Sequence, residues 1–210
     1  VSAPGKRFPE DRKVTDLLLD SYEKALAGEP FSAEVDEIKN RFREILADLN
    51  IDFPIEEEIR HLTKSLSSNP KRDYTASRGE YLTAEILARY LGYTFVDPAW
   101  CICFDENGRL NMAMTIRTIR ASLLPLKHAV IAGFYGADMS GKIHTFERGG
   151  SDITGSLVAC ALGADLYENW TDVSGFMMAD PRIIKAPCII DTITYRELRE
   201  LSYMGASVLH

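Results

Sequence analysis

Apolar side chains in the first third of the chain recur at the spacing that places them on one face of a helix. Residues 14–28 show this spacing and end at a glycine, and residues 32–49 repeat it, with Ser32 as the expected N-cap. A third helix is expected after Pro54. Charged residues fill the opposite faces, so we expect this acidic section to be scaffold or partner surface and assign it no chemistry.

The middle of the chain predicts one longer helix and two short strands. Residues 77–92 have helical spacing and end at a glycine, with Glu80 expected in the first turn, where a carboxylate commonly does no more than favour the helix dipole. Short strands are expected at 93–96 and 101–104. A turn at Asp105, Glu106, Asn107 and Gly108 and a helix with Ile116, Ile119, Leu123 and Leu124 on one face should follow.

From Lys127 onwards the spacing alternates between that of strands and that of helices. The apolar run 128–134 predicts a buried strand, 142–146 a shorter strand, 151–163 a helix with Ile153, Leu157 and Ala161 on its apolar face, and 166–170 a further strand. Such alternation favours an α/β fold with a parallel or mixed sheet. Ligands of these sheets lie beyond the carboxyl ends of the strands.

A polar, glycine-containing loop follows the strand expected at 142–146. Arg148, Gly149, Gly150, Ser151 and Asp152 lead directly into the next expected helix. Adjacent glycines let a backbone approach a ligand closely, and a helix N-terminus attracts anions. The alternative is an ordinary loop with a serine or aspartate N-cap, which remains open on this evidence.

Residues 136–142 resemble a phosphate-binding P-loop but lack its essential features. Ile143 stands where a Mg²⁺-binding hydroxyl is needed, and a strand, not a helix, is expected next. We therefore predict a hairpin turn.

Composition narrows the class of protein. The 210 residues, 46% of them hydrophobic, suffice for one substantial core or for a large and a small lobe. A net charge of −7 does not suggest a nucleic-acid surface, and no stretch predicts a membrane span or a signal peptide. The four cysteines form no metal-ligand pattern, which predicts reduced thiols of a cytoplasmic protein.

A second polar loop follows the strand expected at 166–170. Residues 171–175 combine short polar side chains with glycine, and 179–182 end in Arg182. Such groups can hold a ribose and phosphates, although Asp180-Pro181 is also common turn chemistry.

Four motifs in this order resemble the aspartate kinases of the amino-acid kinase family. They are Phe-x-Arg-Gly-Gly-Ser-Asp at 146–152, Trp-Thr-Asp-Val-Ser-Gly at 170–175, Ala-Asp-Pro-Arg at 179–182 and Met-Gly-Ala-x-Val-Leu-His at 204–210. Val1-Ser2-Ala3 and Ser77-Arg78-Gly79-Glu80 match as well, so the resemblance spans nearly the whole chain.

The resemblance implies a three-layer αβα sandwich of the carbamate kinase-like type with a mostly parallel central sheet. Residues 1–126 would bind the amino acid and contain a helical insertion at 14–70, and residues 127–210 would bind the nucleotide. The reaction implied is transfer of the ATP γ-phosphoryl group to the β-carboxylate of L-aspartate, which gives 4-phospho-L-aspartate and opens lysine, threonine and methionine synthesis. Mg²⁺ would arrive with ATP, and no dedicated metal ligands are expected.

Site residues are carried over by their motif positions. Arg148 would hold the α-carboxylate of aspartate, Glu80 its ammonium group, and Asp152 would organise the transfer site. Further substrate-side positions are Ser2, Thr15, Phe134, Gly149 and Ser151. Nucleotide-side positions are Thr171, Asp172, Met177, Asp180, Arg182 and Ser207.

Several departures from the family pattern qualify this expectation. We expect a piece of a longer, homo-oligomeric protein, because the family's Lys-Phe-Gly-Gly-Ser segment would precede Val1 and its regulatory ACT domains would follow His210. Ser207 replaces the usual lysine, and Met177 replaces a common aromatic residue. The piece alone is therefore expected to be inactive. The alternatives are a kinase for a glutamate-type substrate and a non-catalytic ligand-binding or assembly module without nucleic-acid or membrane contacts.

Overall fold

The computed structural model describes residues 1–147, 149–170, 178, 184–185, 187–194, 196–197 and 200. The chain divides into two compact units, Val1–Asp165 and Leu166–His210.

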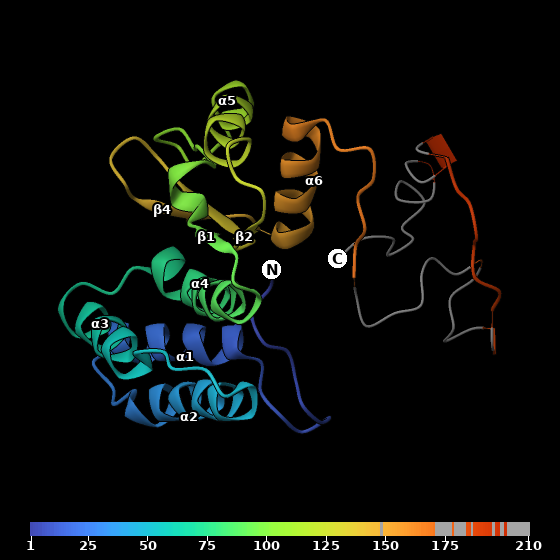
Figure 1. The fold of residues 1–210 in the computed structure, drawn as a ribbon. Helices are drawn as coiled ribbons and strands as arrows, with labels where there is room; N and C mark the ends of the chain where they lie inside the picture. Colours follow the sequence, from blue (N-terminus) through green and yellow to red (C-terminus); the bar gives the residue numbers. More distant parts are fainter. Residues whose placement is uncertain are drawn as a thin grey trace. The chain divides into compact units, whose positions relative to one another are not determined.

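Four helices form the N-terminal half of the first unit (Figure 1). They are α1 (Val14–Ala27), α2 (Ser32–Leu49), α3 (Ile55–Ser68) and α4 (Arg72–Leu91). Their apolar faces meet in one core that includes Leu17, Ile38, Phe42, Leu62 and Leu82. The three helices predicted before residue 70 are confirmed, because burial of one apolar stripe per helix is what their spacing encodes.

Two helix starts differ from the sequence-based expectation. Phe31 occupies the N-cap position of α2, and Ser32 is already the first helical residue, so the predicted serine cap is wrong. Helix α4 begins at Arg72 and not at residue 77, which moves Glu80 from a first turn into the helix interior. Ser77 does not cap the helix; its hydroxyl donates to the Tyr74 carbonyl oxygen (2.8 Å) within the helix.

Two short strand pairs lie beside α4. Strands β1 (Thr94–Val96) and β2 (Ala129–Ile131) are parallel, with Phe95 opposite Val130. Strands β3 (Tyr135–Ala137) and β4 (Ile143–Thr145) are antiparallel, with Gly136 opposite His144. The described residues therefore contain both parallel and antiparallel pairs.

The strand expected at 101–104 is reduced to two isolated bridges. Cys103 bridges Ala137 in parallel, and Phe104 bridges Leu110 in antiparallel fashion. The 3-10 helix η1 (Pro98–Trp100) runs directly into this segment, and the amide of Ile102 donates to the Pro98 carbonyl oxygen (2.8 Å). A backbone donor used in this way is not available to a regular ladder.

The strands lie between two layers of helices in the first unit (Figure 1). On one side, α4 contributes Ala84 and Ala88 to a core with Val130 and Tyr135. On the other side, α5 (Met112–Leu123) and α6 (Gly150–Leu162) bury side chains that include Ile119 and Leu157 against the strands and loops. This helix–strand–helix layering positions the carboxyl end of β2 at the start of α6.

The β3–β4 connection is a hairpin turn, as predicted in place of a P-loop. The carboxylate of Asp138 accepts hydrogen bonds from the amides of Ser140 (2.8 Å) and Lys142 (3.1 Å). Its other oxygen lies 2.9 Å from Nε2 of His144. The aspartate thus organises the turn that the glycines allow.

Several apolar side chains that the sequence predicts on buried faces lie outside the core. Leu124 is 55% exposed because α5 ends at Leu123, and Ile153 is 38% exposed near the start of α6. Residues 166–170, all of them described, form no strand. Leu166 and Trp170 in that segment are exposed and have no ladder partner to bury them.

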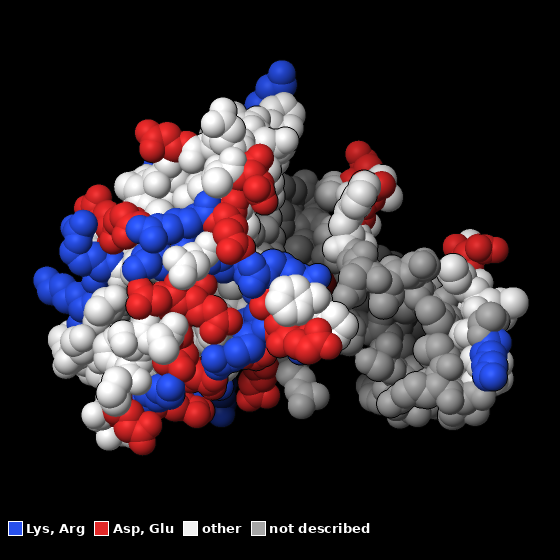
Figure 2. All heavy atoms as spheres, turned by 90° about the horizontal axis from the view of Figure 1, so that it is seen from below, with Lys and Arg blue, Asp and Glu red and all other residues white. Residues whose placement is uncertain are grey.

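The face formed by the lower helices carries interleaved charges. Viewed from below, acidic and basic side chains alternate over the helical section (Figure 2). Whether this section is scaffold or partner surface stays a prediction. Within the described residues, the helices are all too short or too polar for membrane crossing. In the second unit, the described fragments include a reciprocal cap, in which the Thr194 amide donates to Glu197 (2.9 Å) and the Glu197 amide donates to the Thr194 hydroxyl (3.3 Å).

Candidate substrate site

The start of α6 is pressed directly against the chain that leaves β2. A Cβ placed on Gly133 would lie 2.5 Å from the Ser151 hydroxyl oxygen and 2.8 Å from Ser151 Cα. A Cβ on Gly150 would lie 2.8 Å from Phe134 Cα. Real side-chain carbons do not approach backbone this closely, so only glycine fits at both positions.

Phe134 holds an uncommon backbone conformation at this junction. Its φ of 79° is in the left-handed region, which is rare for a bulky residue. The Phe134 amide donates to the Thr154 hydroxyl (3.2 Å), and its carbonyl oxygen accepts from the Phe146 amide (2.9 Å). Contacts from α6 and from the loop after β4 therefore fix the strained residue, a situation typical of functional sites.

Helix α6 presents its N-terminus at this junction. Gly149 is the N-cap with a φ of 59°, and Gly150, Ser151 and Asp152 form the first turn. Because first-turn amides have no helical acceptor and the dipole adds positive potential, this end of α6 suits an anion. The helix start predicted for Ser151 and Asp152 is thus confirmed.

Glu80 is a buried carboxylate in the interior of α4. It is 6% exposed, and its Oε2 atom has no hydrogen-bond partner among the described residues. Burial raises the pKa of Glu80 to about 7, although backbone hydrogen bonds and the charge of Arg78 act in the opposite direction. A buried carboxylate without a full set of partners is costly, and a cationic ligand would offset that cost.

Residues 1–3 connect Glu80 with the end of β2. The Val1 nitrogen donates to the Ile131 carbonyl oxygen (3.0 Å), and the Gly133 amide donates to the Val1 carbonyl oxygen (2.8 Å). Ala3 then packs on α4, since a Cβ on Gly79 would lie 2.8 Å from Ala3 Cβ. Ser2 lies exposed between these two attachments.

The first turn of α1 reaches the same part of α4. Thr15 is half-buried there, and the preceding Val14 has its Cγ1 3.4 Å from the Cβ position of Gly79. These contacts connect residues 1–3, the start of α1, α4, the end of β2 and the start of α6, the segments that carry Ser2, Thr15, Glu80, Phe134, Gly149, Ser151 and Asp152.

Arg78 is surrounded by aromatic rings beside Glu80. Its guanidinium carbon lies 4.5 Å from the ring centre of Tyr74, 4.4 Å from that of Tyr81 and 5.6 Å from that of Tyr135. Rings at these distances attract a cation through their negative faces. The positive charge of Arg78 lowers the pKa of Glu80 and so favours its ionised form.

The remaining predicted site residues lie outside the described residues. They are Arg148 on the substrate side and Thr171, Asp172, Met177, Asp180, Arg182 and Ser207 on the nucleotide side. Their roles stay predictions. Within the part of the chain that the structure describes, no three or more His, Cys, Asp or Glu side chains are grouped as for a metal ion.

The sequence-based reading missed three residues of this site. They are Gly133, which admits Ser151; Thr154, which binds the Phe134 amide; and Arg78, which lies next to Glu80. Gly133 had a usable signal, because a glycine that ends an apolar strand indicates a close backbone approach. Thr154 had none, because its partner Phe134 is 20 positions away. Arg78 had a local signal, because Tyr74 and Tyr81 stand four residues before it and three after it, the spacing of neighbours on one helix face.

Comparison with known proteins places the chain in a family. The model of the amino acid kinase family matches residues 16–210. The chain belongs to the amino acid kinase family, and the predicted family and αβα fold are both confirmed.

Relatives of known sequence are aspartokinases. Aspartokinase 3 of Bacillus subtilis is 37% identical over 225 residues, covering 100% of this chain and 49% of the relative. Lysine-sensitive aspartokinase 3 of Escherichia coli is 32% identical and covers 94% of this chain and 48% of the relative. The chain thus spans about half the length of these relatives.

The solved structures to which the chain is similar are aspartate kinases as well. Aspartate kinase of Clostridium acetobutylicum superposes with a TM-score of 0.90 at 47% identity, over 100% of this chain and 47% of that one. Escherichia coli aspartokinase III in complex with aspartate and ADP superposes with a TM-score of 0.77 at 29% identity, over 94% of this chain and 48% of that one.

Proposed function

We propose that this chain is the catalytic part of an aspartate kinase, which transfers the γ-phosphoryl group of ATP to the β-carboxylate of L-aspartate. The similarity to aspartokinases over the whole chain supports the proposal. The observation that carries it is Glu80, a buried carboxylate whose Oε2 atom has no hydrogen-bond partner among the described residues. Residues 1–3 connect α4 with the end of β2, which packs against the N-terminus of α6, an end that suits an anion. An amino acid supplies both complementary charges, a cation and an anion.

Glu80 would bind the ammonium group of the substrate. An ammonium has three donors and a full positive charge, so it would satisfy the unpartnered Oε2 atom and keep the carboxylate ionised. N-acylated substrates lack this charge and are disfavoured. Arg148 would bind the α-carboxylate as a bidentate fork, with Ser2, Thr15, Phe134, Gly149 and Ser151 completing the substrate side.

The chemistry requires positioning and charge neutralisation, with no covalent help from the protein. An oxygen of the substrate β-carboxylate attacks the γ-phosphorus, the bond to the β–γ bridging oxygen breaks, and its electron pair leaves with ADP. No proton moves, so no general base is needed. Amides at the start of α6 would stabilise negative charge near the transferred group, and Asp152 would orient the reacting groups.

The nucleotide side of the proposal rests on the motifs. Residues 127–210 would bind ATP with its Mg²⁺, with contacts from Thr171, Asp172, Met177, Asp180, Arg182 and Ser207, while residues 1–126 would bind the amino acid. We further propose that the full-length protein is cytoplasmic and forms homo-oligomers.

Acyl phosphate trapping tests the proposal. The full-length protein is incubated with ATP, Mg²⁺, hydroxylamine and one amino acid at a time, and hydroxamate is measured. We expect a signal with L-aspartate, lost in Arg148→Ala and reduced in Glu80→Gln. N-acetyl-L-aspartate is the matched control substrate, since it lacks only the ammonium group.

Each other outcome has a defined meaning. A signal with L-glutamate alone would keep the family and change the substrate. Absence of any signal from a folded, ATP-binding protein would refute the kinase and favour the ligand-binding module.

A further inference from the structure

The segment 4–13 joins two parts of the proposed substrate site. It follows Ser2 and Ala3 and ends at α1, whose first turn carries Thr15. These residues form no helix or strand, so regular backbone hydrogen bonds do not fix their course. Side chains from elsewhere therefore contribute much of what holds the segment in place.

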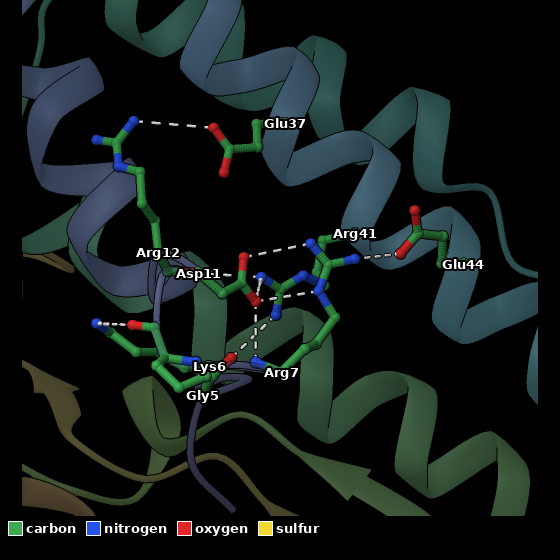
Figure 3. A network of polar contacts seen from close by, with 9 residues as sticks. Gly5, Lys6, Arg7, Asp11, Arg12, Glu37, Arg41 and Glu44 are labelled. Carbon is green, nitrogen blue, oxygen red and sulfur yellow. Dashed lines mark hydrogen bonds and ion pairs between the residues drawn. The ribbon is translucent and has the colours of Figure 1, made fainter.

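Arg41 of α2 binds this segment at three points (Figure 3). Its Nη1 donates to the Gly5 carbonyl oxygen (2.9 Å), and its Nη2 donates to the Arg12 carbonyl oxygen (3.2 Å) and to Asp11 Oδ2. The side chains of Arg41 and Asp11 are each 4% exposed. One rigid guanidinium therefore contacts the beginning and the end of the segment.

Asp11 completes the attachment from within the segment. Its carboxylate accepts from the Arg7 amide (2.9 Å) and from Arg7 Nε (3.0 Å) and Nη2 (3.2 Å), in addition to Arg41. Hydrogen bonds from Arg7 and the charge of Arg41 hold the pKa of Asp11 well below its usual range. The outer pairs of Arg7 with Glu44 and of Arg12 with Glu37 are exposed and contribute little (Figure 3).

Both ends of the segment lead to Glu80. Before it, Ala3 packs at Gly79; after it, Val14 packs at the same glycine, and the Val14 amide donates to the Pro4 carbonyl oxygen (3.4 Å). A shift of the segment would therefore displace Ala3 and Val14, which both pack at Gly79, the residue next to Glu80.

We propose that Arg41 is a positioning residue that holds segment 4–13, and through it Ser2, Ala3 and Thr15, in the arrangement that binds the amino-acid substrate. Arg41 itself touches no substrate. Its helix is a suitable anchor, because the adjacent Ile38 and Phe42 are fully buried in the helical core. This inference rests on the proposed function.

Steady-state kinetics of the full-length protein test the inference, with Arg41→Met and Arg41→Lys as variants. Misplaced binding groups reduce rates by up to about 100-fold, so we expect Arg41→Met to raise the KM for aspartate about 10-fold or more. The KM for ATP should stay within about two-fold of the wild-type value. The KM for aspartate of Arg41→Lys should lie between the wild-type value and that of Arg41→Met, because an ammonium keeps the charge but cannot reproduce a planar fork.

Lys24→Met is the matched control. It breaks a different ion pair of α2, that of Glu34 with Lys24 in α1 (2.6 Å), without removing a contact to segment 4–13. It should leave both KM values unchanged. If Lys24→Met raises the KM for aspartate as much as Arg41→Met does, or if Arg41→Met lowers kcat alone, Arg41 has only a general structural role.

Limited trypsin digestion gives a readout that does not depend on activity. Segment 4–13 offers cleavage after Lys6, Arg7, Arg12 and Lys13. Cleavage there should be faster in Arg41→Met and Arg41→Lys than in the wild type or Lys24→Met. Equal cleavage rates would refute the inference. A wild-type protein without aspartate-dependent hydroxamate would refute the proposed function instead, and faster cleavage in the Arg41 variants would still be observed.

Discussion

Asp11 and Glu80 are both about 6% exposed, yet their surroundings are opposite. Asp11 receives hydrogen bonds from two arginines and a backbone amide, which lower its pKa. Glu80 keeps an oxygen that has no partner among the residues the structure describes, and burial raises its pKa. Burial alone therefore does not indicate the role of a carboxylate; the number of its partners does.

The difference is the one expected between a structural acid and the ligand-binding acid that we propose Glu80 to be. A carboxylate whose partners are all internal stabilises the fold and has no capacity left for a ligand. A carboxylate with an unmet acceptor costs stability until a cation arrives. Substitutions at the two sites should therefore act in opposite directions on the free energy of unfolding.

The largest effect is expected from Arg41→Met. It removes a buried partner of Asp11 and leaves the Gly5 and Arg12 carbonyl oxygens without their donor. Loss of one partner from a buried ion pair costs about 3 to 5 kcal/mol. Hydrogen exchange of the α1 and α2 amides in the full-length protein measures this loss. Unchanged protection would mean that the network does not stabilise these helices.

The pH dependence of stability should separate the two acids. The pKa of Glu80 is about 7 in the folded protein, against 4.5 for an unperturbed glutamate. Between pH 4.5 and about 7 the folded state therefore retains a proton that the unfolded state has released. Stability relative to Glu80→Gln should thus be highest below about pH 4.5 and fall by roughly 3 kcal/mol as the pH rises to about 7. The contribution of Asp11 has the opposite sign, being present above its unfolded pKa and lost in acid.

Thermal midpoints of the wild type and Glu80→Gln, measured between pH 4.5 and 8, test this sign. Parallel curves for the two proteins would contradict a raised pKa of Glu80.

The substitution Glu80→Gln is expected to have a smaller effect, which is on substrate binding. Hydrogen bonds to charged groups contribute about 1.5 to 3 kcal/mol, so kcat/KM for aspartate should fall about 10- to 100-fold. The stability near neutral pH should stay the same or increase, because the buried charge is removed. Glu85→Gln is a suitable control, since Glu85 is another partly buried acid of α4 with an unpartnered oxygen. An equal loss of kcat/KM in both variants would argue against a specific role for Glu80.

The smallest effect is expected from Glu44→Gln. This substitution breaks the exposed ion pair with Arg7 and leaves the Arg7–Asp11 contacts intact. Exposed pairs contribute about 0.2 to 1 kcal/mol, and salt screens them. A loss of stability as large as that of Arg41→Met would show that the exposed Arg7–Glu44 pair contributes as much as the buried Arg41–Asp11 pair.

The sequence predicted the elements whose signals are local. Residues close together in the chain determine the helices α1, α2, α3 and α6. The same holds for the turn at Asp138 and for the helix start at Ser151. The motifs predicted the family for the same reason, because each is contiguous. Family resemblance also selected Glu80, which spacing alone assigned to a helix start.

Features that depend on distant partners could not be predicted in this way. The length of α4 was underestimated because Ser77 and Gly79 read as a helix start, whereas Gly79 is inside the helix to admit Ala3. The Arg41–Asp11 pair joins residues 30 positions apart, and nothing local marks it. Leu166–Trp170 has strand-like composition but forms no strand within the part of the chain that the structure describes.

The glycine contacts at the end of β2 also limit how the proposed site could adapt to a ligand. At Gly133 and Gly150 the start of α6 and the residues after β2 touch with no room for a methyl group, so neither can slide past the other. Induced fit on this side is therefore restricted to movement of the two elements as one rigid body.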